Sequence, residues 1–245
     1  MTSSQRPEYG ETWVYESLLG TVPGLRVSGR TAILVQFLGF EAAIVLVAAV
    51  YDLWPAVLPG TVAVAVATIG SWLMLSFSRR VRELPTPTAY RRLLFGSSID
   101  VVLGVVAFVV LVTYLFVIDP RGDGAGLVTE LFGATPPAVA VALALLVLWD
   151  VVYRIGTCWW ASVVGLWRAL VYEFDPVTAR RYRRIDALNV GFAGVQLLLV
   201  PFVLDRPILL AILGGHVVAV VVVASLSMVF GRSGETSRRR PAERR

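Results

Sequence analysis

The sequence contains no lysine, and this absence removes several functional classes. All 22 of its basic side chains are arginines. Retinal and pyridoxal phosphate are both bound through a Schiff base on a lysine, so the chain is neither a rhodopsin nor a pyridoxal enzyme. The phosphate-binding loop Gly-x-x-x-x-Gly-Lys is excluded for the same reason.

Cysteine and histidine are almost as scarce, with one residue of each at Cys158 and His216. A single cysteine excludes a disulfide within the chain and a cysteine-based metal cluster. A single histidine cannot supply the His-Glu-x-x-His ligands of a metal hydrolase. Ser162 lacks the Gly-x-Ser setting of a nucleophile that would pair with this histidine. We therefore expect neither an enzyme nor a protein that carries a metal or a cofactor.

Charged residues make up only 16% of the chain and hydrophobic residues 57%, whereas soluble domains average about 25% charged residues. The apolar residues form runs of about 20, the length that crosses a hydrocarbon core roughly 30 Å thick. The sequence therefore predicts an all-α, polytopic membrane protein with one bundle of six transmembrane helices at residues 31–230. The predicted spans are residues 31–53, 56–77, 97–118, 137–160, 187–204 and 207–230.

Almost all of the arginines lie in alternate gaps between these spans. The gaps 78–96 and 161–186 hold five arginines each, and the two terminal segments hold nine more. The remaining gaps hold only Arg121 and Arg206, beside several acidic residues. Because cytoplasmic loops are enriched in basic residues, we predict a cell-membrane protein with both termini in the cytoplasm.

The net charge of +5 predicts contact with lipid rather than with nucleic acid, because the arginines border apolar helices. We expect the bilayer to be the main partner, through its anionic headgroups. The pattern leaves a homo-oligomer or another membrane subunit open as a further partner. The expected headgroup contacts are Arg79, Arg80, Arg91, Arg92, Arg180, Arg181, Arg183 and Arg184.

Two segments flank the predicted bundle. Residues 1–30 have no signal-peptide pattern, so the first span is expected to remain as an uncleaved anchor behind a cytoplasmic arm. Within this arm, residues 11–19 can form a short helix that places Trp13 at the interface or against the bundle. A partly ordered arm is the alternative. Residues 231–245 are rich in Ser, Gly and Arg and are predicted to be disordered.

The stretch 137–172 is long enough to hold two short spans separated near Arg154. A reversal at that point would have no proline and almost no turn residues. It would also place the arginines that follow on the opposite side of the membrane, against the charge rule. We therefore predict one tilted helix that continues beyond the membrane. In the fifth span, Pro201 is expected to produce a kink.

Five polar residues at membrane depth form the candidate site: Glu41, Asp150, Arg154, Gln196 and His216. A charge in hydrocarbon costs on the order of 2.5–3.5 kcal/mol, so such side chains face protein or water. Glu41 is either a proton or cation carrier or a protonated group in an interhelical hydrogen bond. Asp150 and Arg154 share a helix face, as a substrate site or as a self-neutralising pair. His216 is either a proton relay or a packing residue, and Gln196 is expected to bond between helices.

Three short segments carry a family resemblance: PEYGETWVYE at 7–16, LLFGSS at 93–98 and LWDVVYRIGT at 148–157. They resemble segments of uncharacterised haloarchaeal multi-span membrane proteins, and the resemblance covers most of the chain except the tail. It implies an archaeal host and a membrane location, and it implies no activity. Haloarchaeal proteins usually have acidic surfaces, whereas the loops of this chain are basic. Arginines that face lipid headgroups would account for this difference.

Two functions are compatible with these patterns. The first is a transporter or channel for a small solute or ion, in which the five polar residues line a path across the membrane. The second is a non-catalytic scaffold or partner subunit, in which the same residues bond the helices to one another. A hydrated cavity joining the polar groups would favour transport, whereas groups paired in a dry core would favour the scaffold.

Overall fold

A computed structural model describes Trp13, residues 29–122 and residues 124–231 of the chain. Within these residues, six helices are long and apolar enough to cross a membrane, which confirms the predicted number of spans. The predicted tail and most of the predicted arm helix lie outside the described residues. The helices are α2 (Gly29–Tyr51), α3 (Val57–Arg82), α4 (Thr88–Phe95), α5 (Ile99–Thr113), α6 (Leu127–Phe132), α7 (Ala138–Val171), α8 (Pro176–Gln196) and α9 (Pro207–Phe230).

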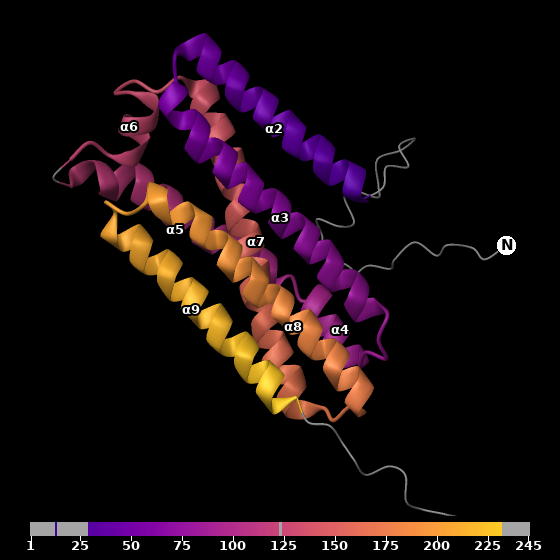
Figure 1. The fold of residues 1–245 in the computed structure, drawn as a ribbon. Coiled ribbons are helices and arrows are strands. Elements are labelled where there is room, and N and C mark those ends of the chain that lie inside the picture. Colours follow the sequence, from indigo (N-terminus) through magenta and orange to yellow (C-terminus); the bar gives the residue numbers. More distant parts are fainter. Residues whose placement is uncertain (1–12, 14–28, 123, 232–245) are drawn as a thin grey trace, which may run out of the picture.

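The long helices run side by side, and the two short helices α4 and α6 lie at opposite ends of the bundle (Figure 1). The start of α2 and the end of α9 lie at the end that carries α4, as an even number of crossings requires. We call this the arginine-rich end, because the arginines of late α3, of α4 and of early α8 lie there. The opposite end is called the α6 end. Which end faces the cytoplasm remains a prediction from the arginine pattern.

Helix α7 is the central element, since it packs against α2, α3, α4, α5, α8 and α9. Its 34 residues are uninterrupted, and at about 1.5 Å per residue they span roughly 51 Å. This length exceeds the roughly 30 Å hydrocarbon core. The prediction of one helix rather than two short spans is therefore confirmed, and Arg154 lies within this helix.

Helix α8 begins earlier than the sequence predicted. Its first residue is Pro176, whereas the predicted span starts at residue 187. The Asp175 carboxylate caps the helix by accepting hydrogen bonds from the backbone N–H groups of Val177 and Thr178, at 3.0 and 3.1 Å. The hydrogen bonds from Thr178 hold the pKa of Asp175 below its ordinary value. The arginines at residues 180–184 therefore lie within the helix. Hydropathy did not include these first turns of α8 in the predicted span, because their residues are polar.

The other end of α8 is shaped by Pro201. The α-helix ends at Gln196, and a 3-10 segment, η4 (Leu197–Phe202), continues to the turn before α9. Proline has no backbone N–H and cannot continue the regular hydrogen-bond pattern. The helix type therefore changes at Leu197, ahead of Pro201, and the predicted kink at Pro201 stays a prediction.

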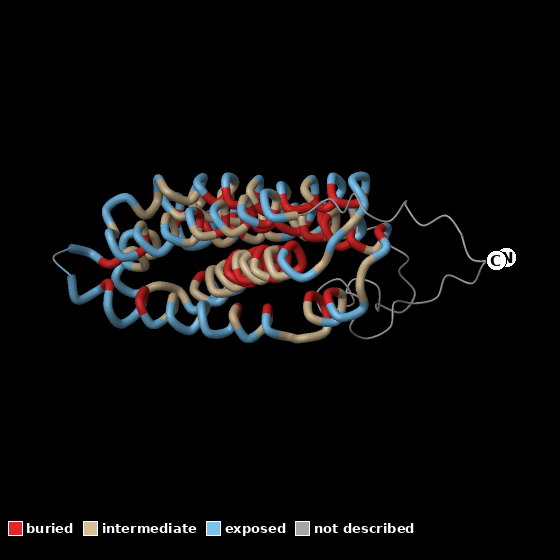
Figure 2. The backbone as a smooth tube through the Cα atoms, turned by 90° about the horizontal axis from the view of Figure 1, so that it is seen from below, coloured by how far each residue is buried: buried red, intermediate tan, exposed pale blue. Residues whose placement is uncertain are grey.

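Buried positions lie where helices face one another, and exposed positions lie on the outer surface of the bundle (Figure 2). This outer surface is apolar: residues such as Leu46, Val106 and Val218 are exposed there. A contiguous apolar exterior of this kind marks a lipid-facing surface. The core is largest at the arginine-rich end, where aromatic residues are frequent. Trp13 contributes to it, with its ring centroid 5.0 Å from that of Phe95, as predicted for contact with the bundle.

Candidate functional site

Asp150 and Arg154 form a closed ion pair on α7. The Arg154 Nη2 donates to Asp150 Oδ1 at 2.5 Å, and Arg154 is fully buried. From α2, the Gln36 Nε2 donates to the second carboxylate oxygen at 2.9 Å. From α3, the Met74 sulfur accepts from Arg154 Nη1 at 3.6 Å. The pair predicted from the i, i+4 spacing therefore exists, and it joins three helices.

The recess beside this pair is narrow. It lies between Gln36 and Asp150, and it is too small to hold a water molecule. The guanidinium side is closed by α3 at Gly70, where a Cβ atom would lie 2.8 Å from the Arg154 Cδ. Only glycine gives the arginine stem this space, so helix packing and the ion pair depend on each other.

Glu41 and Gln196 lie apart from the pair. The Thr61 hydroxyl of α3 donates to Glu41 Oε2 at 2.9 Å, so Glu41 bonds α2 to its neighbour. The other oxygen of Glu41 is buried and has no hydrogen-bond partner among the described residues. Gln196 is fully buried, and neither polar atom of its amide has a partner within the described part of the chain. The structure therefore does not show the interhelical hydrogen bond expected of Gln196.

His216 lies in a different environment from the other four predicted site residues. Its ring lines a large cavity and meets the Trp159 ring edge to face, with 6.4 Å between centroids. Its Nε2 is buried without a partner among the described residues. The structure thus joins only two of the five predicted site residues, Asp150 and Arg154, by a direct contact.

A second buried ion pair was not predicted from the sequence. The Arg168 Nη2 of α7 donates to Asp186 Oδ2 of α8 at 2.6 Å, and both side chains are at most 3% exposed. The Ser227 hydroxyl of α9 donates to the same oxygen at 2.8 Å. The guanidinium carbon lies 4.1 Å from the Tyr182 ring centroid, and the Tyr90 hydroxyl of α4 accepts from Arg168 at 3.3 Å. One charge pair therefore ties four helices together at the arginine-rich end.

The signal for this pair was present but weak. Asp186 is the first acidic residue after the run of arginines at 180–184, and Arg168 lies on the α7 face that includes Arg154 and Gly165. At Gly165, a Cβ atom would lie 3.1 Å from Asp186 Oδ1. The contact was not predicted, because the sequence does not specify that Asp186 of α8 lies opposite Arg168 of α7.

The arginines predicted to contact headgroups lie at the arginine-rich end. Arg79, Arg80, Arg92, Arg180, Arg181 and Arg184 are exposed, whereas Arg91 and Arg183 are half-buried. Exposed guanidinium groups beside apolar helix surfaces suit the interface of an anionic bilayer. Their contact with headgroups stays a prediction.

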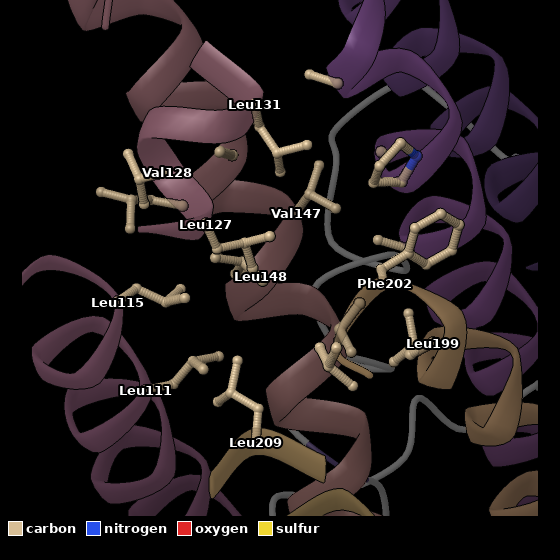
Figure 3. A pocket seen from close by; sticks show the side chains of 18 of the residues that line it. Leu111, Leu115, Leu127, Val128, Leu131, Val147, Leu148, Leu199, Phe202 and Leu209 are labelled. Carbon is tan, nitrogen blue, oxygen red and sulfur yellow. The ribbon is translucent and has the colours of Figure 1, made fainter. Parts of the chain in front are cut away.

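An apolar cavity of about 770 Å³ lies near the α6 end of the described part of the chain. Figure 3 shows its side chains converging from several elements: Leu111 and Leu115 on one side, Leu127, Val128 and Leu131 of α6 above, Val147 and Leu148 of α7 in the centre, and Leu199, Phe202 and Leu209 below and opposite. Sequence reasoning missed it, because each lining residue is an ordinary apolar residue of its own helix.

The two charged residues that line this cavity, Glu130 and Asp205, are both acidic. Both lie at the α6 end, in α6 and in the turn before α9. At the other extreme, the lining includes Ile155 of α7 and His216 of α9, both well inside the bundle. The cavity therefore has two carboxylates at one end, a histidine ring at the other and mostly apolar side chains between them.

Arg206 fastens α6 over this end of the cavity. Its Nη2 lies 2.6 Å from Glu130 Oε1, and its Nε lies 3.5 Å from Asp119 Oδ1. The same Nη2 donates to the backbone oxygen of Ala125 at 2.8 Å, while Asp119 Oδ2 accepts from the Leu127 N–H at 2.6 Å. Desolvation would lower the pKa of Arg206, but the hydrogen bond with Glu130 and the charge of Asp119 outweigh it and raise that pKa.

These features define a helical polytopic membrane protein whose polar groups are separated and whose cavity at the α6 end is mostly apolar. The chain belongs to the family described as "Family of unknown function (DUF7530)", whose model matches residues 8–227. No curated protein and no solved structure matched the chain. The matched range includes all of the three segments that carry the family resemblance except Pro7, and the haloarchaeal host stays a prediction.

Proposed function

We propose that this chain is a non-catalytic integral membrane protein that binds an apolar molecule in the cavity at the α6 end. The observation that carries the proposal is the cavity itself. Its volume of about 770 Å³ falls within the roughly 300–1,000 Å³ typical of ligand sites. An apolar lining gives water few hydrogen-bond partners, so a hydrocarbon is the favoured occupant.

The polar residues support a binding scaffold rather than an ion pathway. Asp150 bonds to Arg154 and to Gln36, and Glu41 bonds to Thr61. Each of these contacts neutralises or satisfies a polar group inside the bundle. Proton or ion movement would need water or a chain of polar groups between them, and the recess beside Asp150 has no room for water. In this proposal, these groups hold helices in place.

Occupancy of the cavity can be tested with two substitutions on α7. Ala144 lines the cavity, whereas Ala142 is exposed on the outer surface and does not line it. The wild-type protein and Ala142→Phe, purified in mild detergent, should retain an apolar molecule that native mass spectrometry detects. Ala144→Phe places a bulky ring in the cavity, and this variant should lose most of the bound molecule. Equal retention by the two variants, or an empty wild-type protein, contradicts the proposal.

The transport hypothesis is tested separately with Glu41. The binding scaffold predicts no pH-dependent flux of small ions in proteoliposomes, for the wild-type protein or for Glu41→Gln. Glu41→Gln should instead lower the thermal midpoint, because an amide is a weaker acceptor for the Thr61 hydroxyl than a carboxylate. A flux that depends on pH in the wild type and disappears in Glu41→Gln would restore the transporter and reject the scaffold.

A further inference from the structure

The cavity has the length of one lipid chain. Ala140 and Ile155 of α7 both line it, and at about 1.5 Å per residue they lie roughly 22 Å apart. One leaflet of a bilayer has a hydrocarbon depth of roughly 15 Å, half of the full core. A single chain of ordinary membrane length therefore fits along α7, from the α6 end to the level of His216.

The charges of the lining differ between the two ends. Glu130 and Asp205 supply carboxylates at the α6 end, and no Arg from the described part of the chain lines the cavity. Arg206 binds Glu130 from outside the lining. The Glu130 side chain is 50% exposed, so its carboxylate remains accessible beside this ion pair. Asp205 is exposed as well.

From this arrangement we propose that the ligand is an amphiphile with one hydrocarbon chain and a cationic head. The inference rests on the proposed function and names its ligand class. The chain lies along α7 inside the apolar cavity, and the ammonium head lies at the α6 end beside Glu130 and Asp205. An anionic head at this position would be repelled by both carboxylates and would compete with Glu130 for Arg206.

The test uses three probes that share one chain and differ in head charge: oleylamine, oleyl alcohol and oleate. The full-length protein is placed in phosphatidylcholine nanodiscs, which carry no net charge, and is labelled with a long-chain diazirine that has an uncharged head. Each probe then competes for the labelled positions, which mass spectrometry maps. Nanodiscs without protein measure how much of each probe partitions into lipid, and this amount is subtracted.

We expect labelling on cavity residues of α6 and α7, with competition strongest for oleylamine, weaker for oleyl alcohol and weakest for oleate. The amine should compete at least about fivefold better than the alcohol, the effect of one carboxylate about 4 Å away in water. The difference should shrink in high salt, which screens exposed charges. It should also shrink in Glu130→Gln/Asp205→Asn, while Asp52→Asn, an acid outside the cavity lining, keeps it.

Failure of this inference is distinct from failure of the proposed function. If cavity residues are labelled but the alcohol or oleate competes as well as the amine, the cationic class is overturned and apolar binding stands. If no cavity residue is labelled, both are overturned; that result is expected if a helix of a second copy fills the cavity.

Discussion

The two ends of the bundle are built on the same central helix but packed in opposite ways. At the arginine-rich end, α7 meets aromatic rings and the buried pair Arg168–Asp186, and its small residues Ala161 and Gly165 sit in close contact. At the α6 end, the same helix presents Ala140, Ala144 and other apolar residues to an open cavity. One end is fixed by specific contacts, and the other leaves space for a ligand.

The difference between the two ends shows where polar groups stabilise this membrane domain. The buried arginines of α7, Arg154 and Arg168, lie near its middle and in its closed half, and each pairs with a carboxylate. The cavity half has apolar walls, and its charges are confined to the mouth, where Arg206 binds Glu130 and Asp119. Interhelical polar bonds therefore stabilise one end, while the other is held only at its rim.

The largest effect is expected from Arg168→Leu, which leaves Asp186 buried without its cation. Breaking one side of a buried pair typically costs about 3–5 kcal/mol. The midpoint of thermal unfolding in detergent should fall strongly. Arg168→Leu/Asp186→Asn should recover part of the loss, because no charge is then left unpaired. If Arg168→Leu unfolds at the wild-type temperature, the arginine-rich end is not held by this pair.

A smaller effect is expected from Gly70→Ala, at the boundary between the two halves. The added Cβ would lie 2.8 Å from the Arg154 Cδ and from the Phe192 ring. Overpacking of this kind costs about 1–3 kcal/mol. Thermal unfolding measures the loss, with Gly39→Ala as the control, since a Cβ there meets nothing within 4 Å. Equal midpoints for both variants would show that α3 and Arg154 are not in close contact.

The smallest effect on stability is expected from Arg206→Gln, which releases α6. The Arg206–Glu130 pair is partly exposed, so water screens it and its loss should cost no more than about 1 kcal/mol. Arg206→Gln should change the rate of ligand exchange more than it changes stability, because α6 covers the cavity. Diazirine labelling of α6 followed over time should reach its plateau sooner in Arg206→Gln. A large thermal loss with unchanged exchange argues against a fastening role.

Hydropathy and arginine spacing were sufficient to predict the number of spans and the continuous α7, because both depend on composition along the chain. The Asp150–Arg154 pair was also predictable, since helical periodicity brings residues four apart together. The early start of α8 was missed, because its polar first turns resemble a loop. The pair Arg168–Asp186 was missed too, because the sequence does not specify that these two residues lie opposite each other.

The cavity could not be predicted for a different reason. It is lined by residues of at least six elements, and nothing in the sequence of any one helix distinguishes them from lipid-facing residues. Whether an apolar side chain packs against a neighbour or lines a cavity depends on how its helix crosses the other helices. The grouping of Glu41, Gln196 and His216 into one polar path had the same weakness, since depth in the membrane does not specify which helices are neighbours.

The most direct test of this asymmetry is to make the same substitution at both ends of α7. Ala161→Leu and Ala144→Leu add the same atoms to the closed half and to the cavity, and their thermal midpoints are compared after bound lipid has been removed by detergent exchange. Ala161 is 1% exposed, so the account predicts a loss of about 1–3 kcal/mol for Ala161→Leu. It predicts no loss, or a small gain, for Ala144→Leu. Equal losses at the two positions would contradict it.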